Sequence, residues 1–212
     1  MIRAKRVSPL FVPDSIINMA AGNISIAFNA LNTSQGIVTA CSSGTNAIGN
    51  AFEYIKQGKA KAIIAGGTEA SVNEIGISGF AALTALSKET DPKKASIPFD
   101  KDRNGFVLGE GSGTVILEDY DHAKARHANI LAEIVGYGTT SDAYHMTAPD
   151  PEGKGAIRAM QQALMKPASM KPKLITSMLM EPAPMLTTAP NLKLLNKSLP
   201  RMTMLKSAVP KG

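Results

Sequence analysis

The sequence predicts an α/β layered fold for residues 1–164, and three observations support this prediction. Short runs rich in apolar and β-branched residues, typical of buried strands, occur at 36–40, 62–65, 114–117 and 130–135. Stretches with apolar residues at helical spacing lie between these runs. Glycine, proline and polar residues separate the two kinds of segment. Such alternation is typical of helices packed on a sheet.

The first predicted element is a helix over residues 13–28. A proline, an aspartate and a serine at 13–15 form a helix-start signal, and the apolar periodicity that follows continues to Phe28. Residues 36–40 then form a short β-branched run that predicts a buried strand.

A tight turn and a second helix follow this strand. The turn is Cys41-Ser-Ser-Gly44, and apolar side chains at helical spacing continue from it through Lys56. Gly58 ends the helix, and residues 62–65 predict another buried strand, which Gly66-Gly67 closes.

Helix and strand alternate again in the rest of this region. Residues 75–87 predict a helix, and a polar loop separates it from a strand at 114–117. A short helix at 119–126 and a strand at 130–135 follow. The glycine-rich stretch 109–113 resembles a phosphate-binding loop, but such a loop must open a helix and this one runs into a strand. We therefore interpret these glycines as turn residues.

Charge and composition divide the chain into residues 1–164 and 165–212. The first part has a net charge of −1, whereas the second has +7, seven of the 13 prolines and one of the 18 glycines. The positive charge therefore marks no folded basic face, and neither nucleic acid nor a membrane is an expected partner. No apolar run approaches the ~20 residues of a membrane span. A single cysteine favours the reducing cytoplasm.

Cys41 is the residue best suited to nucleophilic chemistry. A lone cysteine is usually a small buried apolar residue, but this one follows a predicted strand and opens a predicted helix. The unpaired amides and the positive end of the dipole at a helix N-terminus favour the thiolate, which is the nucleophilic form. The small residues at 42–44 leave room for an acyl group beside the sulfur. The pattern predicts a nucleophilic turn.

Four motifs in order give the chain a specific resemblance over about residues 7–164. They are Thr39-Ala-Cys-Ser-Ser-Gly44, Ala65-Gly-Gly-Thr-Glu69, the stretch 98–111 (Pro-Phe-Asp-Lys-Asp-Arg-Asn-Gly-Phe-Val-Leu-Gly-Glu-Gly) and Ser141-Asp-Ala-Tyr-His-Met-Thr147. Together they resemble the β-ketoacyl-acyl carrier protein synthases, most closely the type II condensing enzymes of fatty-acid elongation. Residues 1–164 correspond to the N-terminal-type domain without its first segment.

The resemblance implies an incomplete thiolase-like α/β/α fold, usually dimeric. It implies that Cys41 takes an acyl chain from acyl carrier protein and condenses it with malonyl-acyl carrier protein, without a metal or other cofactor. Phe80, in the segment that begins at Gly76, matches an aromatic gate beside the acyl pocket, although core packing explains it equally well. Asp142 and His145 match a loop that borders the pantetheine channel.

The family's two catalytic histidines, its lysine and its glycine-rich oxyanion loop do not occur in this sequence, in which no histidine follows His145. One nucleotide added before the codons for residues 178–184 can make them encode Asn-Ala-His-Gly-Thr-Ser-Thr, a family motif. We therefore expect residues 165–212 to be out of frame, or else a divergent basic tail that is disordered. Two hypotheses follow: a condensing enzyme that uses Cys41, or an inactive fragment that at most acylates itself or pairs with an intact subunit.

Overall fold

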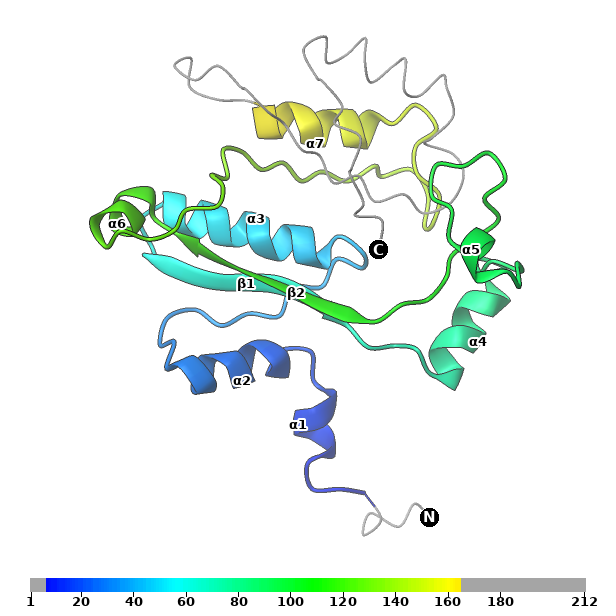
Figure 1. The fold of residues 1–212 in the computed structure, drawn as a ribbon, viewed down its shortest axis with the longest axis horizontal. Coiled ribbons are helices and arrows are strands. Elements are labelled where there is room, and N and C mark those ends of the chain that lie inside the picture. Colours follow the sequence, from blue (N-terminus) through cyan, green and yellow to red (C-terminus); the bar gives the residue numbers. More distant parts are fainter. Residues whose placement is uncertain (1–6, 165–212) are drawn as a thin grey trace.

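The computed structural model describes residues 7–164 of the 212-residue chain, with nine helices and strands in that range (Figure 1). The predicted tail, 165–212, lies outside the described residues. The elements are α1 (Phe11–Ser15), α2 (Met19–Phe28), α3 (Ser43–Lys56), β1 (Ala62–Glu69), α4 (Glu74–Ala82), α5 (Pro92–Ala95), β2 (Gly111–Glu118), α6 (Tyr120–Ala125) and α7 (Lys154–Leu164).

The two strands form an antiparallel pair whose register runs from Ala62 opposite Glu118 to Glu69 opposite Gly111. β1 is longer than predicted, because Gly66 and Gly67 continue the strand and do not close it. A Cβ at Gly66 would lie 2.1 Å from the carbonyl oxygen of Gly113 on the partner strand. Glycine is needed here for close backbone approach within a strand.

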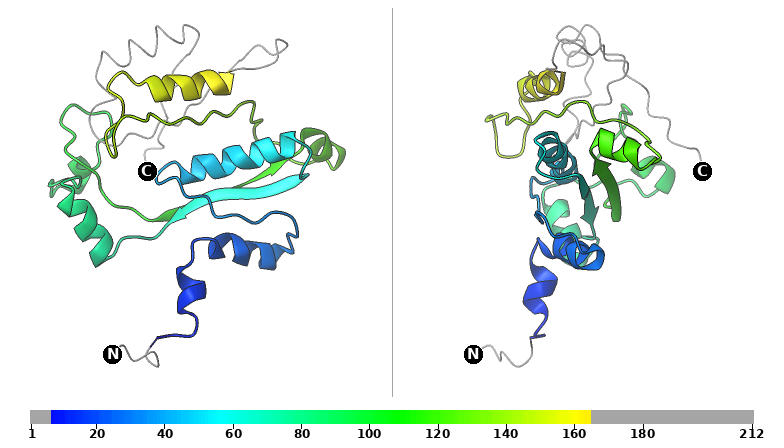
Figure 2. Two further views of the ribbon diagram at one scale, coloured as in Figure 1. Left: turned by 180° about the vertical axis from the view of Figure 1, so that it is seen from behind. Right: turned by 90° about the vertical axis from the view of Figure 1, so that its left-hand side faces the viewer.

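The main core lies between α3 and the sheet. The helix predicted to follow the Cys41 turn and to continue through Lys56 is confirmed as α3. Its apolar face packs on the strands (Figure 2). α2 lies on the opposite side of the sheet from α3 in both figures. Three buried side chains form the centre of this core, with four partly buried ones around them: Ala51, Ala65 and Leu117, then Ile48, Phe52, Ile55 and Ile63.

The helix predicted over 13–28 is two helices. Ile16, with φ −80° and ψ 137°, ends α1 in an extended conformation, and α2 begins three residues later. Asn29 ends α2 in the left-handed region at φ 50°, which asparagine tolerates better than most residues. The predicted helix over 75–87 is also shorter, since α4 ends at Ala82.

The predicted strands at 36–40 and 130–135 are not strands in the structure. Only an isolated bridge between Thr39 and Cys41 lies near the first, and the second is irregular. Both segments have strand composition, but a strand needs a backbone partner, and among residues 7–164 the only sheet contains β1 and β2 alone. A helix that was not predicted, α7, follows the second segment.

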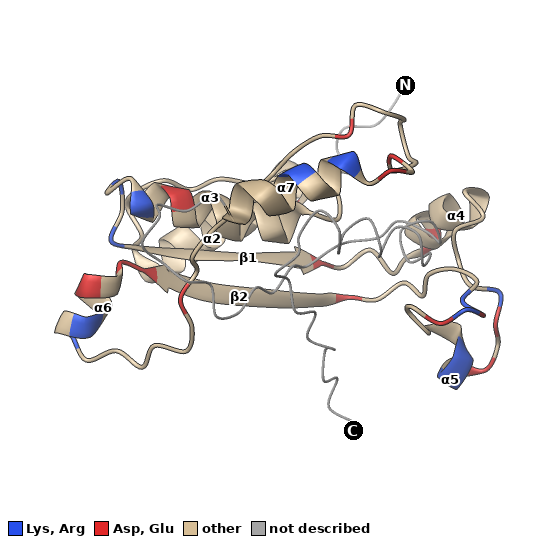
Figure 3. Ribbon diagram, turned by 90° about the horizontal axis from the view of Figure 1, so that it is seen from above, with Lys and Arg blue, Asp and Glu red and all other residues tan. Residues whose placement is uncertain are grey.

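Figure 3 shows charged residues around α5 and α6 and at the ends of the sheet, and also on α3 and α7. The short helix predicted at 119–126 is confirmed as α6, whose N-cap Asp119 accepts a hydrogen bond from the amide of His122. The stretch 109–113 runs into β2 and opens no helix, so the rejection of a phosphate-binding loop is confirmed. The interpretation of its glycines as turn residues is wrong for Gly111 and Gly113, which pair with β1 inside the strand. Within residues 7–164 no helix has the length and apolarity that crossing a membrane requires.

Candidate active site

The turn that carries Cys41 is held in a strained conformation. Ala40 has φ 51°, in the left-handed region that residues with a Cβ rarely adopt. Such strain persists only where the surrounding structure opposes its relaxation, and it is common at functional sites. Here the carbonyl of Thr39 accepts hydrogen bonds from the amide (3.2 Å) and the hydroxyl (2.8 Å) of Ser42. The Ala40 carbonyl accepts the amide and the hydroxyl of Ser43.

The same turn places Cys41 beside the N-terminus of α3. Ser42 is the N-cap, but its side chain accepts no hydrogen bond from the first turn of the helix. The thiol of Cys41 is exposed. Gly44, in the first turn, lies against Gly67 of β1, where an added Cβ would be 3.1 Å from the Gly44 Cα. The predicted small residues therefore let the helix start, the strand and the cysteine turn approach closely.

A hydrogen-bonded chain that was not predicted reaches this turn from the segment before α7. Asn46 Nδ2 donates to Thr39 Oγ1 at 2.8 Å, and the Tyr137 hydroxyl donates to Asn46 Oδ1 at 2.9 Å. The Tyr137 ring covers Gly49, where a Cβ would lie 2.1 Å from a ring carbon. The Gly-Tyr-Gly sequence at 136–138 was the available signal, because glycines on both sides of an aromatic residue indicate close packing.

Gly76 and Phe80 lie on α4. The Gly76 amide donates to Oδ1 of Asn73, the N-cap of the helix, and a Cβ at Gly76 would be 2.2 Å from the Ser71 carbonyl oxygen. Phe80 packs edge-on against Phe106, with ring centroids 6.4 Å apart, and is 39% exposed. Gly76 therefore shapes the start of α4, and part of the Phe80 side chain is accessible to a ligand.

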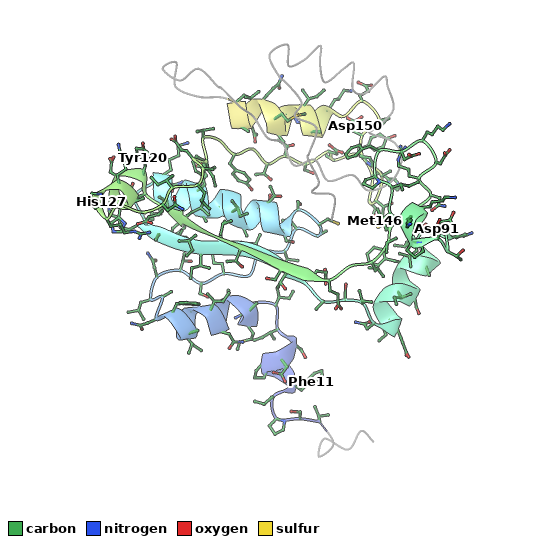
Figure 4. The ribbon with its side chains drawn as sticks, viewed as in Figure 1. Phe11, Asp91, Tyr120, His127, Met146 and Asp150 are labelled. Atoms are coloured by element: carbon green, nitrogen blue, oxygen red, sulfur yellow. The ribbon has the colours of Figure 1, made fainter. Side chains whose placement is uncertain are left out.

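Asp142 and His145 organise their own loop. Asp142 Oδ2 accepts the amide of Asp150 at 2.9 Å, and a Cβ at Gly155 would lie 1.8 Å from Asp142 Oδ1. His145 Nδ1 accepts the amides of Thr147 and Ala148, so the neutral ring carries its proton on Nε2. Figure 4 shows Met146 of this loop on the side of the molecule where α4 and α5 lie, and Asp150 beside the start of α7.

Two other clusters of charged residues lie apart from Cys41 in the sequence. At the end of β2, Arg126 donates to both Glu118 oxygens, at 2.7 and 2.5 Å, and His122 Nδ1 lies 2.5 Å from one of them. The hydrogen bonds from Arg126 lower the pKa of Glu118 to about 2. A cavity of about 310 Å³ is lined by Glu89, Lys94, Ile97, Asp100, Asp102 and Asn104. Among residues 7–164 no cluster of side chains has the composition of a metal site.

Comparison with known proteins decides the family. Residues 2–123 match the family described as "Beta-ketoacyl synthase, N-terminal domain", and residues 131–180 match "Beta-ketoacyl synthase, C-terminal domain". The chain belongs to the beta-ketoacyl synthase family. The chain carries Cys41 in the N-terminal-domain match and Tyr137 in the C-terminal-domain match, so the hydrogen bond from Tyr137 to Asn46 joins the two.

Curated relatives of this chain are named as 3-oxoacyl-[acyl-carrier-protein] synthases. It is 53% identical to "3-oxoacyl-[acyl-carrier-protein] synthase 2" of Staphylococcus aureus over 169 residues, which are 80% of this chain and 42% of the relative. It is 50% identical over 162 residues to the enzyme of that name from Rhizobium meliloti (strain 1021), covering 76% of this chain and 38% of the relative. The chain therefore spans about two fifths of the length of these relatives.

Solved ketosynthases share its fold. One is the ketosynthase bound to a hexaketide and in complex with its type II PKS acyl-carrier protein, with a TM-score of 0.74 and 36% identity over 77% of this chain and 41% of that one. Another is a beta-ketoacyl synthase from Burkholderia phymatum STM815, with a TM-score of 0.65 and 42% identity over 69% of this chain and 36% of that one. The predicted thiolase-like α/β fold, present in part, is confirmed.

Proposed function

We propose that this chain carries the acyl-accepting site of a fatty-acid condensing enzyme, with Cys41 as the nucleophile. The observation that carries the proposal is the strained turn at Ala40, which presents an exposed thiol at the start of α3. The names of the curated relatives support acyl-acyl carrier protein as the donor.

The acyl transfer needs only groups that this turn can supply. The Cys41 thiolate attacks the carbonyl carbon of the donor thioester and forms a new carbon–sulfur bond. The bond from that carbon to the carrier sulfur breaks, and the carrier leaves as a thiolate that takes up the proton lost by Cys41. Backbone amides at the start of α3 are suited to stabilise the negative oxygen of the tetrahedral intermediate.

We propose that condensation follows at the same sulfur in the intact enzyme. Malonyl-acyl carrier protein loses carbon dioxide, and the resulting enolate carbon attacks the acyl group on Cys41. The carbon–sulfur bond to Cys41 breaks and 3-oxoacyl-acyl carrier protein leaves. The cytoplasmic location that the single cysteine favours and the homodimer that the family resemblance implies remain predictions.

In this proposal the four other candidate residues bind the substrate: Gly76, Phe80, Asp142 and His145. Phe80 would border the acyl pocket with the exposed part of its side chain, and Gly76 would set the path of the helix that carries it. Asp142 and His145 would border the channel for the pantetheine arm by ordering residues 141–150. These roles predict that Phe80→Ala changes the preferred acyl length and leaves the chemistry at Cys41 intact.

The first experiment is the acylation of the full chain by octanoyl-acyl carrier protein, followed by peptide mass spectrometry. We expect one octanoyl group on the peptide that contains Cys41 and none in Cys41→Ser. The chain unfolded in urea is the matched control, because it retains the thiol and loses the turn. Equal acylation of the folded and unfolded chains, or none of either, would contradict the proposal. Release of carbon dioxide from malonyl-acyl carrier protein, measured in parallel, decides whether the chain alone completes the condensation or is the inactive fragment.

A further inference from the structure

We propose that Tyr137 is a positioning residue for Cys41, acting through Asn46 on the strained turn. The inference rests on the proposed function, since it concerns the nucleophile of that reaction. It assigns a role to a residue 96 positions away from the cysteine, outside the four motifs that identify the family.

The segment around Tyr137 places the side chain of Tyr137 against α3. A Cβ at Gly136 would lie 2.0 Å from the Ala163 carbonyl oxygen, and one at Gly138 would lie 1.9 Å from that of Ala159. Both glycines therefore face the backbone of α7, whereas the ring of Tyr137 between them lies against Gly49 of α3. The segment lies between α7 and α3 (Figures 1 and 2).

Two further hydrogen bonds fix this segment on α7. The Thr139 amide donates to Gln162 Oε1 at 3.1 Å, and the Thr140 hydroxyl donates to the Gly155 carbonyl at 2.6 Å. These two hydrogen bonds therefore hold the backbone next to Tyr137 against α7. Its ring fills the space that Gly49, a buried residue, leaves open on α3.

From the Tyr137 hydroxyl, three hydrogen bonds lead to the turn. Tyr137 donates to Asn46 Oδ1, and Asn46 Nδ2 donates to Thr39 Oγ1. The Thr39 amide donates to Ser43 Oγ at 2.9 Å. Because the Asn46 amide donates through Nδ2 and accepts through Oδ1, it is held in a single orientation. This orientation fixes the position of the Thr39 hydroxyl.

Thr39 is the residue before strained Ala40, and Cys41 is the residue after it. A left-handed alanine persists only where the surrounding structure holds it in place. The chain from Tyr137 holds the side chain of Thr39, while Ser42 donates to the Thr39 carbonyl and Ser43 donates to the Ala40 carbonyl. Loss of the Tyr137 hydroxyl should therefore loosen the turn, while the ring still covers Gly49.

The test compares Tyr137→Phe with Tyr54→Phe, both in the full chain. Tyr54 lies on the same helix, and its ring contacts Lys59, so its substitution controls for the loss of a phenol. We expect amide hydrogen exchange in residues 39–46 to be roughly two- to tenfold faster in Tyr137→Phe, as loss of one hydrogen bond implies. We expect Cys41 to change its rate of alkylation by iodoacetamide, and Tyr54→Phe to change neither rate.

Two measurements separate positioning from general destabilisation. Asn46→Ala should loosen the same turn, and adding Tyr137→Phe to it should have no further effect, because the link is already broken. In acylation by octanoyl-acyl carrier protein, the saturating rate should fall several-fold in Tyr137→Phe and the half-saturating carrier concentration should stay constant. A structural loss alone would reduce the folded fraction and leave the rate per folded molecule unchanged.

Equal exchange in Tyr137→Phe and Tyr54→Phe would overturn the inference, and so would additive effects of Asn46→Ala and Tyr137→Phe. If Cys41 of the unsubstituted chain accepts no acyl group, the proposed function fails. The exchange and alkylation results still decide whether Tyr137 holds the turn, so the two failures are distinguishable.

Discussion

At the scale of single residues, the carboxylate of Glu118 provides a measurable dependence of stability on pH. Its pKa falls from 4.5 to about 2, chiefly through the hydrogen bonds from Arg126 and then through His122. Because the folded chain has the lower pKa, this contribution to stability is fully present above about pH 4.5. It is lost as the pH falls toward about 2. We expect Glu118→Gln to lower the urea midpoint at about pH 6 and to flatten its dependence on pH below 5.

Glu152→Gln is the matched control for this prediction. Glu152 also pairs with one cation, Lys154, but both side chains are more than half exposed, and such pairs contribute ~0–1 kcal/mol. Its unfolding midpoint should fall less than that of Glu118→Gln above about pH 4.5, and the difference between the two variants should shrink as the pH falls toward about 2. Parallel pH profiles of the two variants would show that the Arg126 contacts do not persist in solution.

The residue types around Cys41 predicted a nucleophilic thiol. They did not reveal the hydrogen bonds from Asn46 and Tyr137 that support its turn. Cys41 could be singled out because its small neighbours and its place between a strand-like run and a helix are local features. Asn46 and Tyr137 are 91 positions apart, and no periodicity links them. Contacts of this kind depend on how α3 and the segment before α7 pack, which is a property of the fold.

At the scale of elements, Gly66 determines how closely β1 and β2 approach. An alanine there would place its Cβ 2.1 Å from the Gly113 carbonyl oxygen, and backbone cannot move away as a flexible side chain would. We expect Gly66→Ala to destabilise the chain by ~1–3 kcal/mol, in the range of overpacked cores. The urea midpoint measures the loss.

Gly113→Ala is the control for Gly66→Ala, because an added Cβ there meets nothing within 4 Å. Its ordinary effect is a small gain from the reduced entropy of the unfolded chain, ~0.4–1 kcal/mol. Similar midpoints for the two variants would mean that the strands lie farther apart in solution than in the structure.

The errors in the predicted strands have a common physical cause. Residues 36–40 and 130–135 have strand composition, but strand formation depends on a neighbouring backbone that composition does not reveal. The opposite error occurred at Gly66-Gly67, where glycines typical of a turn serve close strand pairing. α3 and α6 were predicted well, since helices form from contacts within one segment.

At the scale of the whole molecule, the described part exposes more large apolar side chains than it buries. Within residues 7–164 five apolar side chains are buried, whereas 28 large apolar ones are exposed. Soluble monomers rarely expose apolar patches of more than a few hundred Å². Ile26 on α2 is 79% exposed, and Leu131 is 90% exposed. Such positions contribute little to the free energy of folding when nothing covers them.

Lysine substitutions at these two positions test whether the faces are free in solution. If they are, Ile26→Lys and Leu131→Lys should leave the urea midpoint within ~0.5 kcal/mol of the original chain, as surface changes do. Light scattering should fall, since the new charge opposes association of apolar faces. Ala51→Lys is the control that must unfold the chain, because Ala51 is 5% exposed in the core of α3. A large loss of stability in Ile26→Lys or Leu131→Lys would instead mean that another chain covers that face, and the loss would then depend on protein concentration.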